Sequence, residues 1–125
     1  MTMSDWNTED LRKLRETDDL HIAPLRDDGV TLGTLTWIWS VVVDGHLYVR
    51  AYNGTSSGWY KAAVRQKAGR ITAAGMTKDV FFERADENLN STIDEAYKKK
   101  YASSPYLGSM IGAKASAATL RIIPK

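Results

Sequence analysis

The sequence predicts a mixed α+β domain in which a mostly antiparallel sheet closes as a small barrel. The strongest signal is a run rich in Thr, Trp, Ile and Val at residues 34–43, followed by Asp44-Gly45 and a second apolar run at 46–52. This pattern is typical of a β-hairpin with a two-residue turn. Helical patterns separate the strands, in the order helix, three strands, helix, two strands, helix, strand. With 125 residues and 43% hydrophobic content, the chain is expected to form one domain over residues 1–125.

The N-terminal part is expected to hold a short helix and an edge strand. Asn7 or Thr8 can cap a helix whose first turn is acidic. Residues 20–27 have an extended pattern, and Pro24 favours an edge position because proline has no N–H to give to a neighbouring strand. Asp28-Gly29 then indicates a tight reversal of the chain.

A helix and two short strands are expected in the middle of the chain. Residues 59–67 form a helical pattern that contains two alanines, small enough for close packing on a sheet, and Ala68-Gly69 is the expected end. Two strands should follow at 70–74 and 80–84.

The C-terminal part is expected to hold an amphipathic helix and a last strand. Residues 91–94, Ser-Thr-Ile-Asp, have the character of a capping box. The triplet at 98–100, Lys-Lys-Lys, resembles a phosphate-binding cluster, but acidic residues four positions earlier make a solvated helix face the simpler interpretation. Residues 106–111 are ambiguous, and 118–123 are expected to form the last strand.

Composition limits the class of function. Seventeen Lys and Arg against fifteen Asp and Glu give a net charge of only +2, so neither nucleic acid nor an anionic membrane is an expected partner. The apolar runs are far shorter than the ~20 residues that span a bilayer, and no secretion signal is expected. The absence of cysteine fits a reducing compartment, and cytoplasmic localisation is expected. The two histidines, His21 and His46, have no acidic cluster at metal-ligand spacing, so no metal site is expected.

The hairpin register predicts two unlike faces of the two strands. The expected pairs are Val43 with His46, Val41 with Tyr48, Trp39 with Arg50 and Trp37 with Tyr52. Because side chains alternate, these residues share one aromatic face. The opposite face is aliphatic and is expected to fill the barrel: Ile38, Ser40, Val42, Leu47, Val49 and Ala51. A flat aromatic ligand or a second subunit would cover the aromatic face; the alternative is that the chain's own helices cover it, with Arg50 stacked on Trp39.

A polar loop at residues 53–58 begins where the aromatic face ends. Its Asn, Thr and Ser side chains, its two glycines and the N-terminus of the following helix together match the needs of a phosphate group. Arg50, Lys61 and Arg65 are the nearby residues that can supply positive charge. Turns use the same residue types for conformational reasons, so an ordinary strand-to-helix turn is the alternative.

The segment GVTLGTLTWIWSVVVDGHLYVRAYNGTSSGWYKAAVRQKAGRITAAG resembles an uncharacterised branch of the flavin- and deazaflavin-binding split-barrel group, which includes pyridoxamine-phosphate-oxidase-like proteins and deazaflavin-dependent nitroreductases. The resemblance extends over residues 26–84. It implies a small split β-barrel with three or four flanking helices, a homodimer, and FMN or a deazaflavin as cofactor. The implied cofactor-binding residues are Thr34, Thr36, Trp37, Arg50, Asn53, Ser56, Ser57, Trp59, Lys61 and Arg65. The implied substrate side is formed by Trp39, Tyr101, Tyr106 and Met110.

Three functions compete at this point. The first is a flavin- or deazaflavin-binding oxidoreductase that acts on a small organic substrate by hydride transfer, with catalytic side chains unknown. No serine-hydrolase elbow and no phosphate-binding lysine loop is present, so a cofactor is expected to carry any chemistry. The second is a non-redox module that binds a small molecule in the same aromatic cleft. The third, binding of single-stranded nucleic acid, has aromatic platforms but no basic groove.

Overall fold

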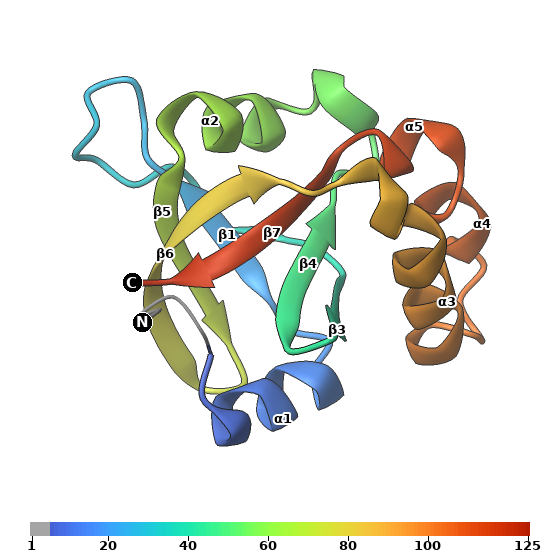
Figure 1. The fold of residues 1–125 in the computed structure, drawn as a ribbon. Coiled ribbons are helices and arrows are strands. Elements are labelled where there is room, and N and C mark those ends of the chain that lie inside the picture. The colour runs from blue at the N-terminus through green and yellow to red at the C-terminus, as the bar shows by residue number, and fades with distance from the viewer. Residues whose placement is uncertain (1–5) are drawn as a thin grey trace.

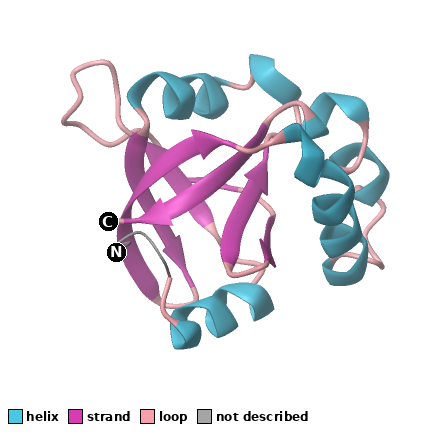
Figure 2. Cartoon of the chain, in the orientation of Figure 1, coloured by secondary structure: helices cyan, strands magenta, loops and turns pink. Residues whose placement is uncertain are grey.

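The computed structural model describes residues 6–125 as a curled antiparallel sheet surrounded by helices (Figure 1). The elements in chain order are α1 (Thr8–Glu16), β1 (His21–Pro24), β2 (Thr36–Trp37), β3 (Ser40–Val43), β4 (His46–Arg50), the 3₁₀ turn η1 (Gly54–Ser56), α2 (Gly58–Gln66), β5 (Ala68–Ala73), β6 (Met76–Arg84), the 3₁₀ turn η2 (Glu87–Leu89), α3 (Asn90–Lys100), α4 (Leu107–Met110), α5 (Ala113–Ser116) and β7 (Thr119–Pro124). Figure 2 shows α1 and α2 at opposite ends of the sheet and the three C-terminal helices beside it. The α+β class and the barrel-like sheet are confirmed.

The order of strands explains the curl of the sheet. Seven strands pair in the order β2-β1-β5-β6-β7-β4-β3, and every pair is antiparallel. The two edge strands, β2 and β3, are consecutive in the chain and separated only by Ile38 and Trp39. So short a link requires the two edges to lie close together, and the sheet therefore bends into a split barrel.

The hairpin register is confirmed near the turn and wrong beyond it. Val43 pairs with His46 and Val41 with Tyr48, as expected. Trp37 does not pair with Tyr52; it pairs with His21 of β1. The expected strand at 34–43 is broken at residues 38–39, where the backbone leaves one edge of the sheet and joins the other.

The helix boundaries follow local chemistry, with corrections at the C-terminus of α2 and the N-terminus of α3. Asn7 caps α1, and its side chain accepts a 2.7 Å hydrogen bond from the Asp10 N–H, as expected. Helix α2 ends earlier than expected because Lys67 adopts a left-handed conformation with φ 60°. Helix α3 begins at Asn90 without a side-chain cap, so the expected capping box at 91–94 does not form.

Pro24 does not mark a free edge strand, because β1 lies between β2 and β5.

The lysine triplet at 98–100 is only partly a solvated face. Lys98 lies 3.1 Å from Glu95, its partner three residues earlier. Lys100 instead points inward and donates to the carbonyl oxygens of Ser40 (2.8 Å) and Leu14 (3.3 Å). Burial lowers the pKa of Lys100 to about 8.

Two apolar clusters hold the fold together. The first fills the interior of the curled sheet and includes Ile38, Leu47 and Val49, as expected. The second lies between the outer face of the β3–β4 hairpin and α3, and includes Trp39, Val41, Val43, Tyr48, Ile93, Tyr97 and Tyr101. The chain's own helix therefore covers most of the aromatic face. Across residues 6–125, no helix is both long and apolar enough to traverse a bilayer.

Candidate functional site

An open groove lies where the β2–β3 link, the loop after β4 and the segment before α4 meet. Its volume is about 840 Å³, within the range of pockets that hold small organic ligands. The lining residues are Thr36, Trp37, Ile38, Trp39, Arg50, Tyr52, Asn53, Ser57, Trp59, Ser104, Pro105, Tyr106 and Met110. The groove therefore occupies the part of the aromatic face that α3 leaves uncovered.

Large aromatic side chains form the rim of the groove. Trp37 is 54% exposed and Tyr106 is 61% exposed. The Trp37 indole is oriented by a 2.6 Å hydrogen bond from Nε1 to the Asp18 carbonyl oxygen. The Tyr52 and Tyr106 rings meet edge to face with centroids 6.2 Å apart. Exposed aromatic rings fixed in this way are a ready stacking surface for a flat ligand.

A rigid aromatic stack lies beneath the rim. The Trp39 and Tyr101 rings are parallel, with centroids 4.0 Å apart and an interplanar angle of 3°. The Tyr101 hydroxyl accepts from the Ser40 N–H (3.2 Å) and donates to the Ser40 carbonyl oxygen (3.3 Å). Burial raises the pKa of Tyr101 to about 12, so this hydroxyl stays protonated at neutral pH. Tyr101 thus supports Trp39 from behind and does not line the groove.

Arg50 is fully buried and bound by its own chain. Its Nη1 donates to the Asp94 carboxylate and to the Met110 carbonyl oxygen (3.1 Å), and its Nη2 donates to the Asn90 carbonyl oxygen (3.2 Å). Its Nε donates to Thr119 Oγ1 at 3.0 Å. The guanidinium also lies over the Tyr97 ring, 5.3 Å from the centroid, whereas the alternative considered from the sequence stacked it on Trp39. Arg50 therefore joins β4 to α3, α4 and β7.

The glycine-bearing loop after β4 is mainly a structural turn. Gly54 has φ +74°, and a Cβ there would lie 2.6 Å from Cγ of Lys114 in α5. The Ser56 hydroxyl donates to the Asn53 carbonyl oxygen (3.1 Å), inside the loop. Two residues of the loop line the groove: Asn53 at its start, and Ser57, which precedes α2 and makes no side-chain capping bond.

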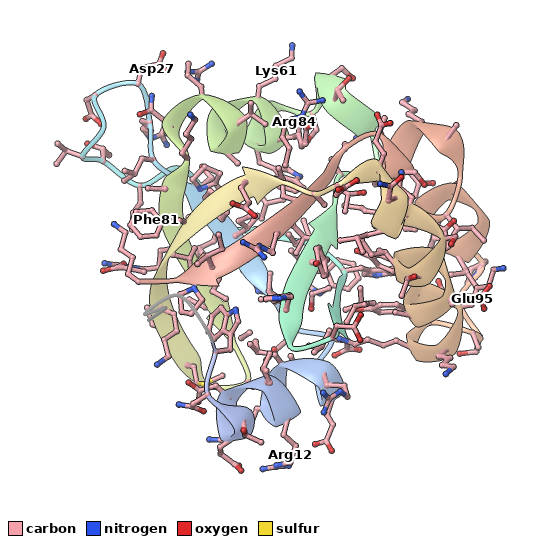
Figure 3. The ribbon with its side chains drawn as sticks, in the orientation of Figure 1. Arg12, Asp27, Lys61, Phe81, Arg84 and Glu95 are labelled. Atoms are coloured by element: carbon pink, nitrogen blue, oxygen red, sulfur yellow. The ribbon has the colours of Figure 1, made fainter. Side chains whose placement is uncertain are left out.

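A second, smaller hollow adjoins the groove. Its volume is about 360 Å³, and its lining residues are Pro24, Leu25, Arg26, Asp27, Gly33, Thr34, Thr36, Gly58, Trp59, Ala62 and Arg65. Thr36 and Trp59 line both hollows. Figure 3 shows Asp27 on the protruding loop beside α2 and Lys61 pointing outward from that helix.

The structure gathers most of the predicted site residues around the groove. Those that line it are Thr36, Trp37, Trp39, Arg50, Asn53, Ser57, Trp59, Tyr106 and Met110. Thr34 and Arg65 line the second hollow, whereas Ser56, Lys61 and Tyr101 line neither. Their roles in binding, like the homodimer, stay predictions.

Sequence reasoning missed four groove residues. Tyr52 was placed on the aromatic face and could have been chosen by the same argument as Trp37. Ile38 was assigned to the barrel interior, which it also helps to fill. Ser104 and Pro105 carry no local signal, because only the packing of the 101–107 turn brings them to the groove.

The groove offers few groups for acid–base chemistry. Among residues 6–125, its lining contains no Asp, Glu, His, Lys or Cys, and the one charged lining residue, Arg50, is paired with Asp94. Within residues 6–125, no cluster of three His, Cys, Asp or Glu side chains has metal-binding geometry. Tyrosine hydroxyls, Ser57 and Asn53 are the polar groups that can orient a ligand.

Fold and groove together define an α+β protein of the split-barrel type, with an aromatic groove at the open edge of its sheet. The chain belongs to the family described as "Uncharacterized protein conserved in bacteria (DUF2255)", whose model matches residues 10–122. No curated protein matches the sequence. The fold is similar to that in a crystal structure of an FAD-binding protein from Mesorhizobium loti, with a TM-score of 0.52 and 15% identity over 99% of this chain and 92% of that one. This similarity supports the fold.

Proposed function

We propose that this protein binds a flavin-type cofactor, FMN, FAD or a deazaflavin, with its ring system in the aromatic groove, and acts as an oxidoreductase on a small organic substrate. The observation that carries the proposal is the half-exposed Trp37, fixed by its hydrogen bond to Asp18 at the rim of a groove of about 840 Å³. The FAD-binding protein that shares the fold adds support from outside the chain.

The residues of the groove fit a flat, largely apolar ring with polar edges. Trp37, Tyr106 and Trp59 supply stacking surface, and Asn53 and Ser57 supply hydrogen-bonding groups on one side. Because Trp39 is held rigidly by Tyr101, the floor loses little conformational entropy when a ring packs on it.

The chemistry of a flavin or deazaflavin is hydride transfer at its ring system. The chain's own part is binding and orientation. Asp94 pairs with the Arg50 charge, so the groove presents neutral groups to a ligand ring. The aromatic rim also reduces the water in contact with that ring. Among residues 6–125, the lining has no Asp, Glu, His, Lys or Cys, which agrees with a role in which the protein positions reactants.

Titration of the purified protein with FMN, FAD, riboflavin and a 5-deazaflavin tests the proposal. We expect saturable quenching of flavin fluorescence, and an affinity about tenfold lower in Trp37→Ala, since loss of one aromatic stack is worth roughly 1.4 kcal/mol. Phe81→Ala is the matched control, because Phe81 is 46% exposed on β6, outside the groove. Absence of binding for all four ligands, or equal affinity in the Trp37 variant, would refute the proposal.

A second candidate is a non-redox protein that binds an aromatic small molecule in the same groove. The observation that favours it is that the described residues of the lining include no Asp, Glu, His, Lys or Cys, and that Arg50 is paired with Asp94. It predicts tryptophan fluorescence changes with uncharged aromatic ligands and no redox turnover in the presence of any flavin. The two candidates are distinguished by reducing the flavin-loaded protein with dithionite in the absence of oxygen and following the flavin absorbance as an organic electron acceptor is added.

A further inference from the structure

The second hollow adjoins the aromatic groove along Thr36 and Trp59, which line both. A ligand whose ring lies in the groove therefore has these two side chains between it and the second hollow. The two spaces differ in chemistry. The groove is aromatic with a single, paired charge, whereas two arginines, Arg26 and Arg65, line the hollow.

Both arginines keep donor atoms available for a ligand. Within residues 6–125, the Arg26 guanidinium donates only from Nε, to the Leu32 carbonyl oxygen at 3.2 Å, which leaves both Nη atoms. Arg65 Nη2 lies 2.6 Å from Asp27 Oδ1, in a pair whose side chains are 56% and 82% exposed. Exposed pairs of this kind are weak, so an anion with better geometry can share or replace Asp27. Two arginines and one aspartate leave the hollow with a net charge of +1.

The loop that carries Arg26 is held in a defined shape. The Asp28 carboxylate accepts from the N–H groups of Val30 (2.9 Å) and Thr31 (2.8 Å), and the Arg26 N–H donates to the Thr31 carbonyl oxygen (2.7 Å). A backbone fixed in this way limits the positions that the Arg26 side chain can take. The cost of ordering the arginine on binding is correspondingly smaller.

We propose that the second hollow is a phosphate subsite, and that it selects aromatic ligands that carry a terminal phosphate on a flexible chain. The inference rests on the proposed function of the groove and specifies its ligand. It assigns the phosphate to Arg26 and Arg65, in place of the loop at 53–58 with Arg50 and Lys61. Arg50 is paired with Asp94, and Lys61 lines neither hollow. The planar fork of a guanidinium matches the oxygen atoms of a phosphate.

A comparison of FMN with riboflavin tests the subsite, because the two ligands differ only in the phosphate. We expect FMN to bind about tenfold more tightly than riboflavin at low salt, the effect of one charge-assisted contact. Arg65→Gln should reduce this ratio to less than about threefold and leave riboflavin affinity unchanged. Asp27→Asn should raise FMN affinity by about two- to threefold, since it removes the competing carboxylate. Lys61→Gln is the matched control: it removes one positive charge from the same helix, outside the hollow, and should preserve the ratio.

The outcomes separate the subsite from the groove. If riboflavin binds and FMN binds no more tightly, or if Arg65→Gln leaves the ratio unchanged, the subsite is wrong while flavin binding in the groove stands. An equal fall in the ratio of FMN affinity to riboflavin affinity in Lys61→Gln would also overturn the subsite, because general positive charge would then explain the preference for FMN. If neither flavin binds, both proposals fail. Thermal unfolding of each variant confirms that it is folded before titration.

Discussion

Replacing Arg50 by methionine removes the buried charge that joins β4 to the C-terminal helices, and it is expected to destabilise the protein by about 4 kcal/mol. Removal of one partner from a buried ion pair costs about 3–5 kcal/mol, and the 27% exposure of the Asp94 side chain places this pair toward the lower end. The carbonyl oxygens of Met110 and Asn90 also lose a donor, at about 0.5 kcal/mol for each net hydrogen bond, so the total is about 4 kcal/mol. Methionine retains most of the packing of the aliphatic stem, which limits any added cavity cost.

Urea unfolding followed by tryptophan fluorescence measures this change. With a slope of about 2 kcal/mol per M, the midpoint should fall by about 2 M. Arg12→Met is the matched control, because Arg12 pairs with Glu9 and Glu16 on the surface of α1 and is 51% exposed. Its loss should leave the urea midpoint nearly unchanged, because exposed ion pairs add little to stability. If the free energies of unfolding of Arg50→Met and Arg12→Met differ by less than about 1 kcal/mol, burial of the Arg50 charge has no measurable effect on stability, and the prediction is wrong.

Three other substitutions test separate parts of the structure. Gly69→Ala should lower the free energy of unfolding in urea by about 3 kcal/mol, because its Cβ would lie 2.5 Å from the Ala23 carbonyl oxygen. Gly45→Ala is the control. Its backbone would be strained, at φ +81°, but its Cβ would meet no atom within 4 Å, so it should cost less. Tyr101→Phe should cost about 1–2 kcal/mol, because the buried Ser40 N–H loses its acceptor, and an unchanged midpoint would contradict that bond. Folding lowers the pKa of Lys100 from 10.5 to about 8, so between these values the unfolded chain holds more protons and stability should rise with pH. Unfolding measured from pH 7.5 to 10 should show this rise relative to Lys100→Met, and parallel curves would exclude the effect.

Local signals in the sequence were sufficient for most elements of the fold. Asp44-Gly45 set the hairpin turn with positive φ at both residues, and from it the pairing of Val43 with His46 followed by counting. Asn7 caps α1 because the backbone N–H that its side chain accepts from, that of Asp10, is only three residues away. Both interactions join residues that are close together in the sequence, so a local sequence pattern is enough to predict them.

The break at residues 38–39 could not be predicted in the same way. Residues 34–43 have uniform β propensity, and nothing local marks the point where the strand changes partner. The Ile38 N–H is taken by the Leu20 carbonyl oxygen at 3.0 Å, a contact that exists only once the sheet has curled. Likewise, the capping-box pattern at 91–94 was overridden because Asp94 pairs with Arg50, 44 residues away.

The candidate site likewise has features that could be predicted from the sequence and features that only the tertiary structure shows. The aromatic face was visible in the sequence, since period-two alternation placed Trp37 and Trp39 together, and both line the groove. Only the tertiary structure showed that α3 covers most of this face and that Arg50 is paired with Asp94. Only it placed Arg65 beside Arg26 in a second hollow.

The sequence by itself therefore determined the strands, the hairpin and the kind of surface that the hairpin carries, because these depend on turn chemistry and on the alternation of side chains. The tertiary structure decided which part of that surface remains open and which charges are free to meet a ligand. Those properties depend on contacts between residues far apart in the chain, such as Arg50 with Asp94, and on the closure of the sheet that brings β2 beside β3.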